Sequence, residues 1–123
     1  MRDTIVWQRL EGAAVLLAGL AWLVHAGAPL PVWALVALFF APDLAFAAYG
    51  AGPKIGAFAY NLVHAYGTGA LLLAAGAVAG MPVLAAVGLL WAMHAGFDRM
   101  LGYGLKASTG FADTHLGRIG RSA

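Results

Sequence analysis

Four side chains that can bind a metal lie within or beside segments that otherwise consist of apolar residues: Asp43, His64, His94 and Asp98. Burying such groups in hydrocarbon is costly unless they are paired, hydrated or bound to a metal. His94 and Asp98 are four residues apart, so on a helix they lie one turn from each other on the same face. Imidazole and carboxylate ligands together suit Zn, Fe or Mn. The sequence therefore predicts a buried metal site.

The composition indicates that membrane helices position these groups. Hydrophobic residues make up 63% of the 123-residue chain and charged residues 10%. No charge lies between Glu11 and Asp43 or between Lys54 and Asp98, and each interval can hold two spans of about 20 residues. We expect an all-α, polytopic, single membrane domain over residues 1–123, with four helices in an antiparallel bundle. The predicted spans are about 7–27, 32–49, 55–79 and 82–103, followed by a short tail, 104–123.

The basic residues predict the orientation of the chain. All seven fall on one side of the predicted spans, and the positive-inside rule makes that side cytoplasmic, with both termini there. They are Arg2, Arg9, Lys54, Arg99, Lys106, Arg118 and Arg121. Anionic lipid headgroups account for the net charge of +2, so the expected partners are membrane lipids and not nucleic acid. We therefore expect a multi-pass membrane protein whose tail lies on the cytoplasmic side.

Helical geometry places the four candidate ligands in one layer. At about 1.5 Å per residue, they lie about 12 to 18 Å from the cytoplasmic ends of their spans. Pro42 frees the carbonyl of Leu38 and permits a kink beside Asp43. Polar or small residues form one stripe of the third span, which should face the bundle: Ala57, Tyr60, Asn61, His64, Gly67 and Thr68.

Three further residues could reach this layer. Glu11 lies about one turn into the first span, and Asp113 and His115 form an Asp-x-His pair in the Gly-rich tail. The tail begins where the fourth span leaves the membrane, so it could fold onto the bundle and complete the ligand set. With seven candidate ligands, the site could be mononuclear or dinuclear.

Four sequence strings resemble a known family. They are APDLAFAAYGAGPKIG (41–56), AYNLVHAYG (59–67), HAGFDRMLGYGLK (94–106) and GFADTHLGRIG (110–120). Together they resemble a family of small four-span bacterial integral membrane proteins defined only as a domain of unknown function. The family often has Ser where this chain has Ala45 and a basic residue where it has Ala112. The resemblance implies a fold, a location in the bacterial inner membrane and no established activity. It extends to Glu11, in the LEG of the first span, and the four strings contain the other six candidate ligands, Asn61 and Arg99.

The leading hypothesis is a metal-dependent membrane enzyme, a hydrolase or an oxidase, that acts on a lipid-soluble or headgroup substrate. Arg99 would bind an anionic headgroup, while Asn61 and Tyr60 would orient the ligands through hydrogen bonds.

Three alternatives remain open at this point. A proton or divalent-ion carrier could use the same groups, although the outer half of every span is apolar, so a pore would need a homo-oligomer. A haem binder could use His64 and His94 as axial ligands. In a non-catalytic structural or partner-binding subunit, the carboxylates would only pair with nearby cations, Asp98 with Arg99 or Arg9 and Asp43 with Lys54.

Overall fold

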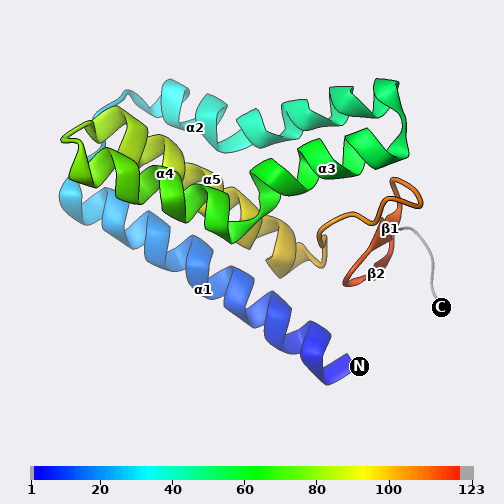
Figure 1. The fold of residues 1–123 in the computed structure, drawn as a ribbon. Coiled ribbons are helices and arrows are strands. Elements are labelled where there is room, and N and C mark those ends of the chain that lie inside the picture. Colours follow the sequence, from blue (N-terminus) through cyan, green and yellow to red (C-terminus); the bar gives the residue numbers. More distant parts are fainter. Residues whose placement is uncertain (1, 120–123) are drawn as a thin grey trace.

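The structure, a computed structural model, describes residues 2–119 of the chain. Five α-helices and one 3-10 helix make up most of this part, and two short strands lie in the tail (Figure 1). The elements are α1 (Arg2–Ala26), α2 (Val32–Phe40), the 3-10 helix η1 (Ala41–Ala51), α3 (Pro53–His64), α4 (Tyr66–Val78), α5 (Pro82–Leu101), β1 (Asp113–Thr114) and β2 (Gly117–Arg118). The predicted all-α class is therefore correct, with a small two-stranded addition.

Helix α5 is the centre of the fold. It packs most extensively against α4 and α1 and also contacts α2, α3 and η1, while α3 packs mainly against η1. Glycines let the helix backbones approach closely: a Cβ atom added to Gly12 would lie 2.5 Å from the Gly96 carbonyl oxygen, and one added to Gly69 would lie 2.6 Å from the Ala92 amide nitrogen. Since α5 is covered by its neighbours, its polar residues are buried.

The two ends of the helical bundle differ in what they carry. The turns at residues 27–31 and 79–81 lie at one end, whereas the N-terminus, the turn at Gly52 and the tail lie at the other (Figure 1). The basic residues within 2–119 therefore belong to segments at the second end, as the sequence predicts. Arg121 and the last residues of the predicted tail, 120–123, lie outside the described residues.

Two segments are long and apolar enough to cross a membrane, α1 and the continuous stretch Val32–Ala51. The pair α3 and α4 would form a third span if counted together. Helix α5 has 20 residues, but His94, Asp98 and Arg99 lower its mean hydropathy, so length and composition support two or three of the four predicted spans.

The predicted third span, 55–79, is not one straight helix. The chain is extended at Ala65 (φ −85°, ψ 141°), and α3 and α4 meet at an angle of 48°. Such a break frees carbonyl groups that a regular helix would pair with later amides. Side chains pair with these carbonyls instead, because the Thr68 hydroxyl donates to the Leu62 carbonyl and Arg99 Nη2 donates to the His64 carbonyl at 2.9 Å. The break also divides the predicted polar stripe, leaving Gly67 exposed.

The expected disturbance at Pro42 is present as a change of helix type. Helix α2 ends at Phe40, and the Ala41 amide donates to the Leu38 carbonyl, the group that Pro42 leaves free. From there the chain continues as the 3-10 helix η1, with Pro42 buried. The change places Asp43 in the first turn of η1.

The tail begins at a C-terminal cap of α5. Gly102 has a left-handed conformation (φ 94°), and the Tyr103 amide donates to the Asp98 carbonyl at 2.7 Å, which is the pattern of a Schellman motif. Strands β1 and β2 then pair antiparallel, and Lys106 forms a single bridge with Thr114. The sequence predicts a tail folded onto the bundle, and in the described residues the tail does contact α3. Its ordered hairpin is a feature that the sequence does not predict.

Candidate metal centre

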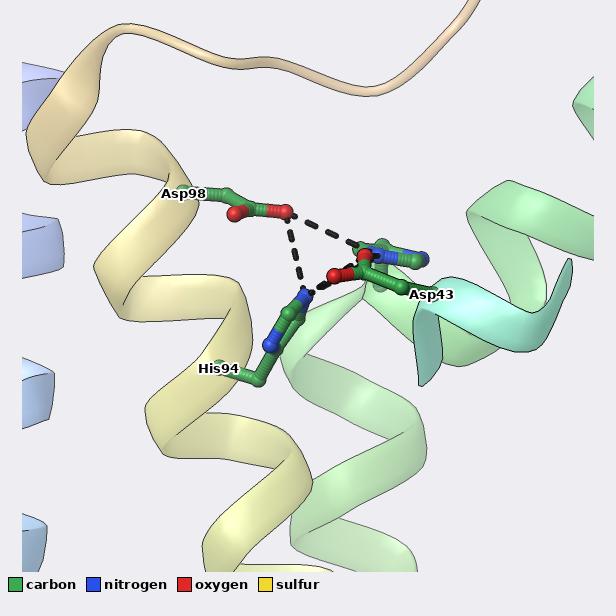
Figure 2. A group of neighbouring side chains, drawn as sticks. Asp43, His94 and Asp98 are labelled. Atoms are coloured by element: carbon green, nitrogen blue, oxygen red, sulfur yellow. Dashed lines mark hydrogen bonds and ion pairs between the residues drawn. The ribbon is translucent and has the colours of Figure 1, made fainter. Parts of the chain in front are cut away.

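Four ligand groups from three elements come together in the interior. We call Asp43, His64, His94 and Asp98 the metal centre; one ligand atom of each lies within 4.8 Å of all the others. Asp43 comes from η1, His64 is the last residue of α3, and the other two lie one turn apart on α5. Figure 2 shows Asp43, His94 and Asp98 pointing toward one another. The predicted convergence of these residues is therefore present.

The spacing of the ligand atoms fits one ion. The Nε2 atoms of His64 and His94 lie 3.2 Å apart, and each lies 3.1 Å from Asp43 Oδ1. Asp98 Oδ2 lies 3.6 Å from His64 Nε2 and 3.4 Å from His94 Nε2. Four ligands around a tetrahedral Zn²⁺ at about 2.0 to 2.1 Å are separated by about 3.3 Å. Five of the six separations therefore lie around the value that such an ion requires, and the sixth, between the two carboxylates, lies within 4.8 Å.

A backbone hydrogen bond fixes the tautomer of His64. Its Nδ1 atom lies 2.8 Å from the Tyr60 carbonyl oxygen, which can only accept, so Nδ1 carries the proton. In the neutral ring Nε2 then has a free lone pair. That lone pair faces carboxylate oxygens of Asp43 and Asp98. The lone pair and the oxygens are all hydrogen-bond acceptors, so they repel one another. A cation or a proton between them is needed to remove this repulsion.

His94 has no comparable support. Its Nδ1 atom is buried and has no hydrogen-bond partner among the described residues. The rings of Phe39 and Phe40 lie against it at centroid distances of 5.3 and 6.1 Å. On the Nδ1 side, packing rather than a hydrogen bond therefore holds this ring in place.

Asp43 is the accessible member of the metal centre. Its side chain is 38% exposed, against 0% for His64, 1% for His94 and 12% for Asp98. It borders a pocket of about 330 Å³, which we call the centre pocket. The lining residues are Asp43, Phe46, Tyr60, Asp98, Tyr103, Lys106, Phe111 and Ile119. A ligand in this pocket would reach the metal centre from the side of the two carboxylates.

Tyr60 contacts two members of the metal centre. Its ring stacks on His64 with a centroid distance of 3.6 Å and an interplanar angle of 9°, and its hydroxyl donates to Asp98 Oδ2 at 3.3 Å. Contacts of this kind orient ligands and tune their basicity. Tyr60 therefore lies beside two of the four groups, and its orienting role stays a prediction.

Asn61 and Arg99 contact backbone groups instead of the metal centre. The Asn61 side-chain Nδ2 donates a hydrogen bond to the Lys106 carbonyl at 2.8 Å, and its Oδ1 accepts one from the Lys106 backbone amide at 2.7 Å. Asn61 therefore holds the tail on α3. Besides the His64 carbonyl, the buried Arg99 donates to the Tyr103 carbonyl at 3.3 Å. Arg99 thus joins the break at Ala65 to the end of α5, and it does not line the centre pocket.

The other three predicted ligands lie elsewhere. Glu11 is exposed on α1. Asp113 pairs with Arg118 and accepts a hydrogen bond from the Thr109 hydroxyl, and mainly this hydroxyl lowers the pKa of Asp113. His115 Nδ1 accepts the Leu105 amide at 2.8 Å, and burial lowers the pKa of His115. Both tail residues stabilise the tail hairpin in this structure and are not among the four converging groups.

Lys106 is a site residue that the sequence does not single out. Only 5% of it is exposed, and its Nζ atom donates to the Phe111 carbonyl at 2.8 Å. The ammonium lies 3.7 Å from the centroid of the Phe111 ring and 4.7 Å from that of Tyr60. Burial among these rings lowers the pKa of Lys106. In the sequence it is one basic residue of a polar tail, and only the folding of the tail brings it to the pocket.

The geometry argues against the haem alternative. Axial ligands bind haem iron from opposite sides of the porphyrin. The Nε2 atoms of His64 and His94 face each other at 3.2 Å, a separation that leaves no space for a macrocycle.

The sequence was compared with known families, curated proteins and solved structures. A model of the family described as Domain of unknown function (DUF4260) matches residues 5–119. No curated protein and no solved structure matches the chain.

Proposed function

Since the chain belongs to the DUF4260 family, whose description assigns no activity, we propose from the metal centre that it is a metal-dependent membrane enzyme. One observation carries this proposal: four buried or half-buried ligand atoms on three elements have the mutual distances of the ligands around one ion. Buried acceptors that face each other are unfavourable without a cation or a proton between them. A divalent ion satisfies all four at once.

We assign one Zn, Fe or Mn ion to Asp43, His64, His94 and Asp98. A second ion would need ligands from Glu11 or from the tail pair, Asp113 and His115, and these have other surroundings in the described structure. When bound, the ion would activate a coordinated water for hydrolysis or, if it is iron, support oxidation.

The chain's own residues have distinct roles around the ion. His64 and His94 are fully buried and hold the ion from the apolar side. Asp43 lines the centre pocket, so its carboxylate would hold the ion on the side from which water or substrate enters. Tyr60 holds the Asp98 carboxylate through its hydroxyl. The expected substrate is lipid-soluble, because the helices that surround the centre present apolar side chains outward.

The same proposal includes the membrane topology. We take α1, Val32–Ala51, the bent pair α3 and α4, and α5 as four spans of a bacterial inner-membrane protein with both termini cytoplasmic. Helix α5 serves as the fourth span because its neighbours cover its polar residues. The metal centre then lies nearer the cytoplasmic face, beneath the tail.

Metal analysis tests the proposal. The detergent-purified wild type should contain about one equivalent of a transition metal, and the variants His94→Ala and Asp98→Ala should contain less than about a tenth of that amount, because each loses one of four ligands. The matched controls are His25→Ala and Asp113→Ala, which remove a histidine and an aspartate outside the metal centre. Both controls should keep the metal.

Two results would contradict the proposal. One is a wild type that stays free of metal after incubation with Zn, Mn and Fe(II). The other is full metal occupancy in both the His94 and the Asp98 variants. In either case the hydrogen-bonded set Asp43, His64 and His94 would favour the alternative of a proton carrier, which would need an oligomer to cross the apolar outer half of the bundle.

A further inference from the structure

Lys106 is a buried cation that forms no ion pair with a carboxylate among the described residues. Its ammonium has three donors, and one of them goes to the Phe111 carbonyl. The ammonium also lies over the Phe111 and Tyr60 rings. None of the ion pairs among residues 2–119 includes Lys106, although it lines the centre pocket together with Asp43 and Asp98.

The charges around the metal centre indicate what the pocket can bind. The carboxylates of Asp43 and Asp98 balance the buried cations Arg99 and Lys106. A divalent ion at the metal centre leaves an excess of two positive charges in a mostly apolar interior. Such an excess is unfavourable unless an anion offsets it. Arg99 already donates to two backbone carbonyls, so Lys106 is the cation that remains for a ligand.

We propose that the centre pocket binds a molecule with an oxyanion group, phosphate or carboxylate, on an apolar chain, and that Lys106 and the metal-loaded centre hold the oxyanion between them. This inference rests on the proposed function, because the excess of positive charge depends on the ion.

The walls of the pocket fit the apolar part of such a ligand. Phe46, Phe111 and Ile119 line it beside the charged groups. Its volume of about 330 Å³ lies at the small end of the range for ligand pockets, about 300 to 1,000 Å³. It therefore holds a headgroup with a short length of chain, and a longer chain would extend out of the pocket. Lys106 is then the residue that selects anionic over neutral amphiphiles.

Three probes with four carbon atoms each test this inference: butyl phosphate, butyrate and butanol. The protein is loaded with Co(II), whose visible absorption reports both ion binding and changes around the ion. We expect butyl phosphate or butyrate to shift the absorption and to saturate, and butanol to do neither. The comparison of the two anions distinguishes a phosphate from a carboxylate ligand.

Variants then assign the effect to Lys106. Lys106→Met should weaken binding of the anion at least about tenfold while Co(II) binding stays as in the wild type, since a charged hydrogen bond is lost. Lys106→Arg should restore part of the binding, and the exposed Lys54, changed in Lys54→Met, is the matched control and should have no effect.

The outcomes separate the two proposals. Co(II) bound without any response to either anion overturns this inference alone, as does unchanged anion affinity in Lys106→Met or equal binding of butanol. A wild type that binds no Co(II) overturns the proposed function and this inference with it. If Lys106→Met also loses Co(II), the anion affinity of Lys106→Arg decides. If Lys106→Arg binds Co(II) and still binds the anion, the inference is supported. If Lys106→Arg no longer binds the anion, the inference is overturned.

Discussion

Tyr60 couples the two halves of the metal centre, because its ring lies on His64 and its hydroxyl bonds to Asp98. We predict that Tyr60→Phe, which keeps the ring and removes the hydroxyl, weakens Zn binding about tenfold, the usual effect of losing a partner that orients a ligand. Competition with a chromophoric chelator measures the affinity. Tyr66→Phe is the control, because the buried Tyr66 hydroxyl has no hydrogen-bond partner among the described residues. Equal affinities in the two variants would remove Tyr60 from the site.

The convergence of Asp43, His64, His94 and Asp98 could be predicted from sequence, because ionisable residues stand out in apolar segments and helical spacing gives their depth. The partners of Arg99 and Asn61 could not be predicted from sequence, because both residues form hydrogen bonds with backbone groups. Those groups become available only through the break at Ala65 and the path of the tail. The place of Lys106 in the pocket could not be predicted either, because it too depends on the path of the tail. Nothing in the local sequence distinguishes Lys106 from a basic residue at a membrane boundary.

At the scale of elements, Asn61 determines where the tail lies. Its two hydrogen bonds to Lys106 replace the pairing that a neighbouring strand would provide. We predict that Asn61→Ala releases this part of the tail at a cost of about 2 kcal/mol, which corresponds to about thirtyfold faster hydrogen exchange at the Lys106 amide. Hydrogen–deuterium exchange in detergent measures it.

Two observations make this test specific. The helical circular dichroism of Asn61→Ala should match that of the wild type, because the two hydrogen bonds between Asn61 and Lys106 lie outside the contacts of α5 with α1 and α4. Thr109→Ala removes only the exposed bond to Asp113 and should leave the Lys106 amide protected. Wild-type exchange in Asn61→Ala would mean that other contacts hold the tail, such as the packing of Phe111 against Phe46 and Tyr49.

The Pro and Gly residues predict the ends of the helices, whereas no residue in the sequence predicts the break within the third span. Gly52 and Gly102 stand at element ends with positive φ angles of 112° and 94°, and Pro53 and Pro82 begin helices. Ala65 carries no such signal. The carbonyls that its extended conformation leaves free are satisfied by Thr68 and by Arg99 from another helix, so the break depends on tertiary contacts.

For the whole molecule, the placement of the metal centre has meaning only if the four-span topology is correct. With four spans, the centre, the tail and all the basic segments share the cytoplasmic side, and a ligand enters the centre pocket from that side or from the inner leaflet. With two or three spans, as length and composition alone allow, α5 would lie outside the apolar layer, although it packs extensively against the apolar helix α1.

The absence of cysteine from the sequence makes this topology directly testable, since a single introduced cysteine has no background. We predict that a membrane-impermeant maleimide labels Ala28→Cys in spheroplasts and not in inverted vesicles, and labels Ser108→Cys with the opposite preference, because the positive-inside rule places the tail in the cytoplasm. Both positions are exposed. Ala51→Cys, at the end of η1 just before α3, should behave like Ser108→Cys. Labelling of Ala28→Cys and Ala51→Cys from the same side would mean that Val32–Ala51 does not cross the membrane and would overturn the four-span arrangement.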